Sequence, residues 1–255
     1  MGGISMVSVT KRISAVKQPR GGYIKPKYFV VTELLDADIL NEIENIHSSL
    51  VGTAVDYLTR LLNGEPIEKA FRISIMGAAR VQETKLANEL LINIQGVDDT
   101  SIESACKMVG FDVAFRSGPD LYKPVELIKP DKETISNIRT MVRRGMNFFK
   151  LYGPIIKNGF NFEGGYTSTI STGDGDFLTE DTLWDFKVSK SAPTNKHTLQ
   201  LYIYYLMGIR SIHPEFKQIG NLGIFNPRLN KVYLLPISKI PNDITNEVNN
   251  TVIGY

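Results

Sequence analysis

The chain has 255 residues, of which 42% are hydrophobic and 22% charged, and its formal net charge is +2. This is the composition of a folded globular protein with one elaborated domain or two small ones. Cys106 is the only cysteine, which excludes an intramolecular disulfide and a four-cysteine iron–sulfur cluster or zinc site. No apolar run reaches membrane-spanning length and residues 1–6 lack a signal peptide's apolar core, so we expect no membrane contact and a cytoplasmic location.

The first thirty residues are predicted to be irregular, with a loop at 19–23. Six basic residues precede the first acidic residue, Glu33: Lys11, Arg12, Lys17, Arg20, Lys25 and Lys27. Such a basic arm either follows the phosphates of a nucleic acid or is simply solvated, and both interpretations stay open at this point.

Residues 37–118 are predicted to be mainly helical, and a further helix follows a linker. The expected helices span 37–47, 50–63, 66–94 with a break at Gly77, 100–115 and 131–152. Asn63 and Gly64 end the second of them, and the polar residues at 98–100 cap the fourth. The last helix carries a basic cluster: Arg139, Arg143, Arg144 and Lys150.

The pattern then changes to strands. We expect strands at 160–171, 173–179 and 182–189, a helix at 194–212, and two strands at 220–225 and 231–237. Helix, three strands, helix and strand make an α/β core. The sequence therefore predicts a mainly helical region at 1–130, with the basic arm at its start, and a core domain at 131–255.

The chemistry concentrates in the predicted hairpin. Side chains alternate between the faces of a strand, so Asp185 and Lys187 project to the same side. Asp176 precedes the polar turn at 179–182, and an antiparallel return would bring it beside Asp185. Two adjacent carboxylates repel unless a divalent cation lies between them, and Mg²⁺ prefers such oxygens. The alternative is an ordinary ion pair on a solvated strand.

The helix after the hairpin adds two polar residues. Thr194 is its predicted N-cap, and Gln200 and Tyr204 are four residues apart and therefore share a face. If this face is buried, both side chains need hydrogen-bond partners. Alternatively, Tyr204 is a core aromatic and Gln200 lies at the surface.

Taken together, Asp176, the triplet Asp185 to Lys187, and the pair Gln200 and Tyr204 resemble the motifs of the PD-(D/E)xK nuclease superfamily, in particular its RecB-like and Cas4-like branch. The segment 51–58 is similar to that branch's Gly-Thr-Ala-Val-His helix, with Asp56 in place of the histidine. Aspartate is also a competent ligand for hard cations. The chain departs from the usual Cas4 pattern because it lacks the cluster cysteines.

The resemblance implies a restriction-endonuclease-like core, with the element order αβββαβ and a mixed central sheet flanked by helices. It implies that one or two Mg²⁺ or Mn²⁺ ions are bound by Asp176, Asp185, the backbone carbonyl of Phe186 and Asp56. Lys187 would position the attacking water, and Gln200 and Tyr204 would fix the active-site strand or contact the nucleic-acid backbone. The candidate phosphate contacts are Lys190, Lys196, Arg143 and Arg144.

The predicted function is that of a metal-dependent deoxyribonuclease, an exonuclease or end-processing enzyme acting on single-stranded DNA or duplex ends. No phosphate-binding loop for ATP occurs in the sequence, so any helicase or recombination partner would have to act in trans. Two alternatives remain: a catalytically inactive nuclease-like subunit that binds DNA or joins a complex, and a helical interaction protein with an incidental Asp-x-Lys strand.

Overall fold

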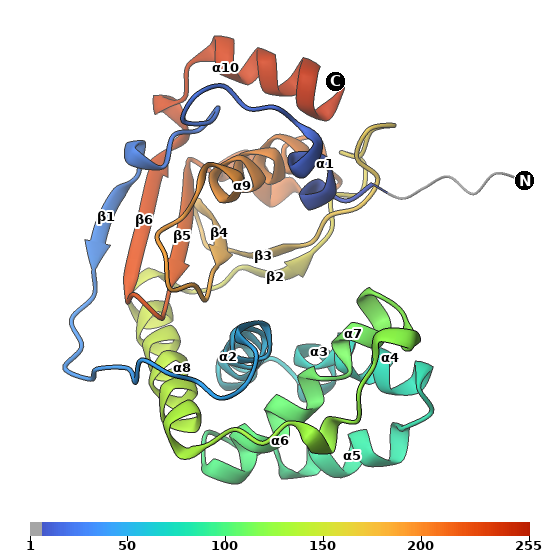
Figure 1. Ribbon diagram of the computed structural model, residues 1–255. Helices are drawn as coiled ribbons and strands as arrows, with labels where there is room; N and C mark the ends of the chain where they lie inside the picture. Colours follow the sequence, from blue (N-terminus) through green and yellow to red (C-terminus); the bar gives the residue numbers. More distant parts are fainter. Residues whose placement is uncertain (1–6) are drawn as a thin grey trace, which may run out of the picture. The chain divides into compact units, whose positions relative to one another are not determined.

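The computed structural model describes residues 7–255 and divides the chain into two compact units (Figure 1). The sheet unit consists of the chain up to Leu34 together with Tyr152–Tyr255, and the helical unit of Leu35–Leu151. This division differs from the predicted boundary at residue 130, since the start of the chain joins the sheet and the long helix before Tyr152 belongs to the helical unit. Residues 1–6, on which the expected lack of a signal peptide depends, lie outside the described part.

The sheet unit is built on six strands, which confirms the α/β class. In chain order these are β1 (Val30–Glu33), β2 (Lys157–Phe160), β3 (Gly175–Leu178), β4 (Thr182–Phe186), β5 (Asn221–Asn226) and β6 (Lys231–Pro236). They lie in the order β1-β6-β5-β4-β3-β2. The β4–β5 pair is parallel and the other four pairs are antiparallel, so the sheet is mixed.

Among residues 7–255 no helix is long and apolar enough to cross a membrane.

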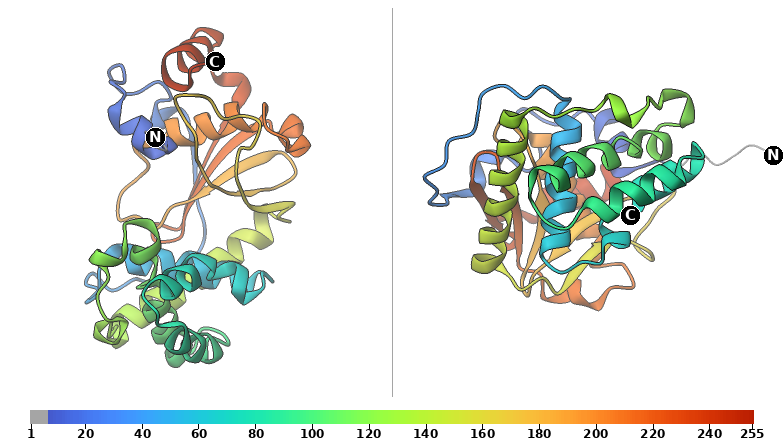
Figure 2. Two further views of the ribbon diagram at one scale, coloured as in Figure 1. Left: turned by 90° about the vertical axis from the view of Figure 1, so that its right-hand side faces the viewer. Right: turned by 90° about the horizontal axis from the view of Figure 1, so that it is seen from below.

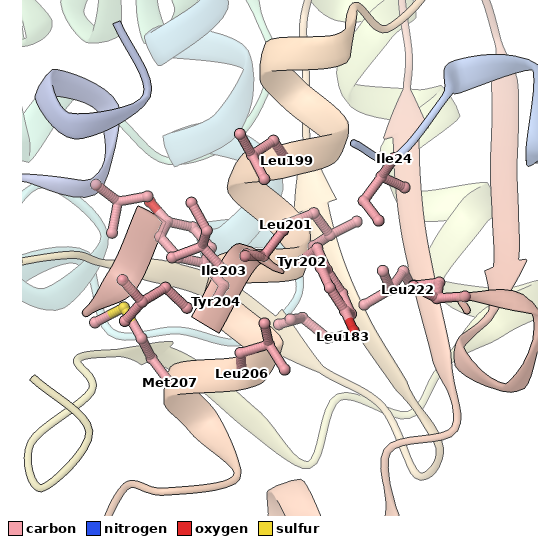
Figure 3. Packing of buried hydrophobic residues seen from close by; sticks show 14 of the residues in the cluster. Ile24, Leu183, Leu199, Leu201, Tyr202, Ile203, Tyr204, Leu206, Met207 and Leu222 are labelled. Carbon is pink, nitrogen blue, oxygen red and sulfur yellow. The ribbon is translucent and has the colours of Figure 1, made fainter. Parts of the chain in front are cut away.

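Helix α9 (Asn195–Gly208) connects the two parallel strands and packs against both of them (Figures 1 and 2). Its apolar side chains meet Leu183 of β4, Leu222 of β5 and Ile24 of the N-terminal segment in one core (Figure 3). Around this core lie α1 (Val9–Ala15), α10 (Asn242–Glu247) with the π-helical Val248–Ile253, and the 3₁₀ turns Pro26–Tyr28, Pro214–Gln218 and Ile237–Lys239.

The helical unit contains seven α-helices: α2 (Ser48–Leu62), α3 (Ile67–Ala70), α4 (Arg72–Arg80), α5 (Thr84–Asn93), α6 (Asp99–Val109), α7 (Asp112–Arg116) and α8 (Lys132–Tyr152). Two 3₁₀ turns, Pro119–Leu121 and Val125–Leu127, complete it. The expected helix at 66–94 breaks at Phe71 and again after Arg80, and not at Gly77. Gly77 lies inside α4, where an added Cβ would be 2.0 Å from the carbonyl oxygen of Phe111.

The predicted helix at 37–47 is wrong, because this segment forms no regular element. Polar groups of the segment and of Asp36, just before it, bind α8. The carboxylate of Asp36 accepts a bond from Nε of Arg144 at 2.5 Å, and the backbone N–H of Asn41 donates to Asn137 at 2.7 Å. The N–H of Asn45 donates to Thr134 at 3.0 Å. These long-range bonds replace the ladder that a helix would have provided.

Two other expectations at the sheet need correction. Of the strand predicted at 160–171, only Phe160 belongs to a strand, the end of β2. The chain then turns at Gly164, whose φ is +88°. Gly165 lies against the carbonyl of Met207. The N-terminal thirty residues are not irregular throughout, since they contain α1 and lead into β1. Strand β1 forms because β6 offers it a partner, with Val30 opposite Leu234.

Candidate active site

The predicted hairpin forms as expected. Strands β3 and β4 are antiparallel, with Phe177 opposite Trp184, and the N–H of Thr179 donates to the carbonyl of Thr182 across the turn at 3.0 Å. Extending this register by one residue places Asp176 opposite Asp185, on the same face of the sheet. The two carboxylates that the sequence singled out are therefore cross-strand neighbours.

Asp176 is tied directly to the next strand. Its Oδ2 accepts a hydrogen bond from the backbone N–H of Phe186 at 2.7 Å. This contact holds the Asp176 carboxylate beside Phe186, the residue that follows Asp185. The described contact of Phe186 with the site is thus made by its N–H, and its carbonyl stays a predicted ligand.

Asp185 is the most deeply buried charge of the sheet unit, with only 3% of its surface exposed. Its Oδ1 lies 3.1 Å from the ammonium nitrogen of Lys187, which confirms that these two side chains share a face. Its Oδ2 is buried and has no hydrogen-bond partner among the described residues. A buried carboxylate oxygen without a partner is costly, so the fold keeps here a group whose oxygen can accept a ligand.

The predicted pair on α9 also lies at this site. Nε2 of Gln200 donates to the hydroxyl of Tyr204 at 2.9 Å, and the Tyr204 ring stacks on Phe162 at 4.8 Å between centroids. Burial raises the pKa of Tyr204, and the negative charges of Asp185, Asp176 and Asp174 raise it further. Tyr204 is therefore a neutral hydroxyl near these three aspartates, and it is a core aromatic. Its role as a site residue stays a prediction.

His197, in the first turn of α9, was not among the residues predicted for the site. It lies three residues before Gln200 and seven before Tyr204, so all three share one helix face. Burial and the positive charge of Lys187 lower the pKa of His197, while Asp185 opposes this shift. Counting along the helix face from Gln200 and Tyr204 would have found it.

The segment that follows Lys187 is held by Asn226, which was also missed. Asn226 is 1% exposed at the end of β5, and its Nδ2 donates to the carbonyl of Ser189 at 2.8 Å. The N–H of Lys187 donates to the carbonyl of Phe225 at 2.9 Å. These bonds fix the chain on both sides of the lysine, which limits the positions that its ammonium group can take.

The remaining predicted residues are placed as follows. Lys190 and Lys196 belong to the sheet unit, before and within the start of α9, and both are exposed. Asp56 belongs to the helical unit, on α2, where its carboxylate lies 3.9 Å from Arg60. Its role as a metal ligand stays a prediction.

Arg143 and Arg144 are engaged in the helical unit. Arg144 is 8% exposed and bonds to Asp36, and Arg143 contacts Asp36 at 3.0 Å and Asp38 at 2.5 Å. These ion pairs give both arginines a structural role, and their role as phosphate contacts stays a prediction. Part of the basic N-terminal arm is structural too, since Arg12 donates to the carbonyls of Thr251 and Val252.

The donor set suits a hard divalent cation. Within the described part of the chain, no three or more His, Cys, Asp or Glu side chains form a group that could hold a metal ion. Mg²⁺ does not need one, because it is usually held by one or two carboxylates while water and phosphate complete its coordination. Asp176 and the unpartnered Oδ2 of Asp185 meet that requirement.

No protein-family model, curated protein or solved structure matches the chain. What the site does must therefore be argued from its own residues.

Proposed function

We propose that the chain is a nuclease that uses Mg²⁺ or Mn²⁺ to hydrolyse phosphodiester bonds in DNA, as an exonuclease or end-processing enzyme. The observation that carries this proposal is the buried carboxylate of Asp185, with one oxygen on Lys187 and the other without a partner, beside Asp176. Two carboxylates can hold a divalent cation that activates water and offsets phosphate charge, and an adjacent ammonium group can stabilise further negative charge there.

The order of the elements supports the same conclusion. Helix α8, the antiparallel strands β2, β3 and β4, helix α9 and the parallel strand β5 follow one another along the chain. This is the αβββαβ order of the restriction-endonuclease-like core, and we propose that core for the chain. In that core, Asp176 would come from the second strand, β3, and Asp185 from the third, β4. Lys187 would follow just beyond the end of β4.

Each residue has a role that follows from its surroundings. Asp176 and Asp185 would hold the cation, which when bound lowers the pKa of a water and offsets charge on the phosphate. Lys187, fixed through its backbone, directs its ammonium group at the attacking oxygen or at the charge that develops on the phosphate. Gln200 and Tyr204 bond to each other on one face of α9 and would fix the active-site strand or contact the nucleic-acid backbone. Lys190 and Lys196 remain candidates for contacts with flanking phosphates.

The test compares purified Asp185→Asn and Lys187→Met with the wild type on labelled single-stranded and duplex DNA, with Mg²⁺, Mn²⁺ or chelator. We expect cation-dependent shortening by the wild type and a loss of at least about 100-fold in each variant. Asp185→Asn loses the ion pair with Lys187 but also the cost of the unpartnered buried carboxylate oxygen, so its melting temperature should stay close to that of the wild type. Asp243→Asn, at the exposed start of α10, is the matched control and should cleave normally.

Unchanged cleavage by either site variant would exclude this site as the catalytic centre. Salt-sensitive DNA binding by the wild type without any product would instead support the inactive DNA-binding subunit.

A further inference from the structure

His197 combines a fixed position with an unused hydrogen-bond donor. The backbone N–H of Thr194 donates to its Nδ1 at 3.2 Å, so the ring is held at the N-terminus of α9. A backbone N–H can only donate, and Nδ1 therefore accepts and carries no proton. The proton of the neutral ring consequently lies on Nε2, and this N–H donates to no atom of the described residues.

The position of His197 relative to the site follows from its helix face. His197 lies on the face of Gln200 and Tyr204, and α9 packs against β4. The charges of Lys187 and Asp185 act on the His197 ring, while those of Asp185, Asp176 and Asp174 act on Tyr204. The His197 ring is thus near Lys187 and Asp185, and the Tyr204 hydroxyl is near Asp185, Asp176 and Asp174.

We propose that the Nε2–H of His197 binds a non-bridging phosphate oxygen of the nucleic-acid substrate, next to the one contacted by Lys187. This inference rests on the proposed nuclease function and deepens it. The capping bond orients the ring before substrate arrives, so the contact costs little side-chain entropy. The residue is a substrate-binding donor and transfers no proton in this role.

Two substitutions of His197 distinguish the role of Nδ1, which accepts the capping bond, from that of Nε2, which carries the donor. In His197→Asn the amide oxygen stands where Nδ1 was, so the cap is kept and the outer donor is lost. In His197→Gln the amide reaches the former position of Nε2, so a donor is kept and the cap is lost. We expect His197→Asn to melt like the wild type but to show kcat/KM reduced roughly 10-fold or more on single-stranded DNA with Mn²⁺. His197→Gln should melt at a lower temperature and recover much of that loss in kcat/KM.

His213→Asn is the matched control, because Nε2 of His213 already bonds to the carbonyl of Asn161 at 3.1 Å, and its kcat/KM should not change. If the wild type cleaves DNA and His197→Asn cleaves equally well, the phosphate contact is refuted while the nuclease assignment stands. If the wild type cleaves nothing with either cation, the nuclease assignment fails and the contact fails with it.

Discussion

Two buried aspartates of this chain, Asp112 and Asp185, differ in whether both of their carboxylate oxygens have a partner. Asp112 of the helical unit accepts a bond from the hydroxyl of Tyr57 at 2.7 Å and another from Ser74 at 2.6 Å. Burial raises its pKa, and these two bonds oppose the shift. Asp185 has an ion pair on one oxygen and no bond on the other. Asp112 therefore stabilises its unit, whereas the half-satisfied Asp185 is explained better by a ligand than by stability.

Asp36 supports a prediction on pH. Burial raises its pKa, but the hydrogen bond and charge of Arg144 outweigh this, and the pKa lies below its ordinary value of 3.8. A depressed carboxylate pKa stabilises the folded state above the unfolded-state pKa, and this contribution is lost as the pH falls through the folded-state value. We expect Asp36→Asn to lower the free energy of unfolding by about 0.5–1.5 kcal/mol at pH 7, and by progressively less below about pH 4.

Urea unfolding of the wild type and Asp36→Asn from pH 7 to pH 2 measures this difference. If the difference in unfolding free energy between the two proteins stays constant over the whole pH range, the ion pair with Arg144 does not contribute as argued.

At the scale of elements, the parallel pair β4–β5 holds the candidate site, and its packing depends on one glycine. Trp184, the neighbour of Asp185, covers Gly223 of β5 so closely that an added Cβ would lie 2.3 Å from the indole ring. We expect Gly223→Ala to cost about 1–3 kcal/mol of unfolding free energy, because Trp184 must move. The control is Gly220→Ala, three residues earlier, where an added Cβ meets nothing within 4 Å. Equal melting temperatures for the two variants would contradict this account.

The elements also show what local pattern can and cannot predict. The hairpin, α9 with its Thr194 cap, and α8 were predicted correctly, because turn residues, caps and periodicity act within a few positions. The segment 37–47 was not, because its conformation is decided by bonds to residues of α8 about 90–110 positions away. No periodicity in a short window contains that information.

At the scale of the whole molecule, the two units provide separate signals. Trp184 is the only tryptophan and lies in the sheet unit, so its fluorescence reports on that unit, whereas the helical unit dominates far-ultraviolet circular dichroism. Tyr57→Phe removes a bond to the buried Asp112 and should cost the helical unit about 1–3 kcal/mol. We expect its urea transition to shift more when followed by circular dichroism than by fluorescence. Identical shifts would mean that the units unfold as one.

The sequence by itself determined the chemistry of the candidate site. Asp176, Asp185 and Lys187 come together because a short turn and strand alternation are local, and Gln200 meets Tyr204 because a helix repeats every 3.6 residues. Only the tertiary structure decided which of these groups is buried and left with an unpartnered oxygen, and which ring nitrogen of His197 is free to donate. Burial and hydrogen-bond satisfaction depend on all the elements packed around a group, so they appear only when the chain is folded.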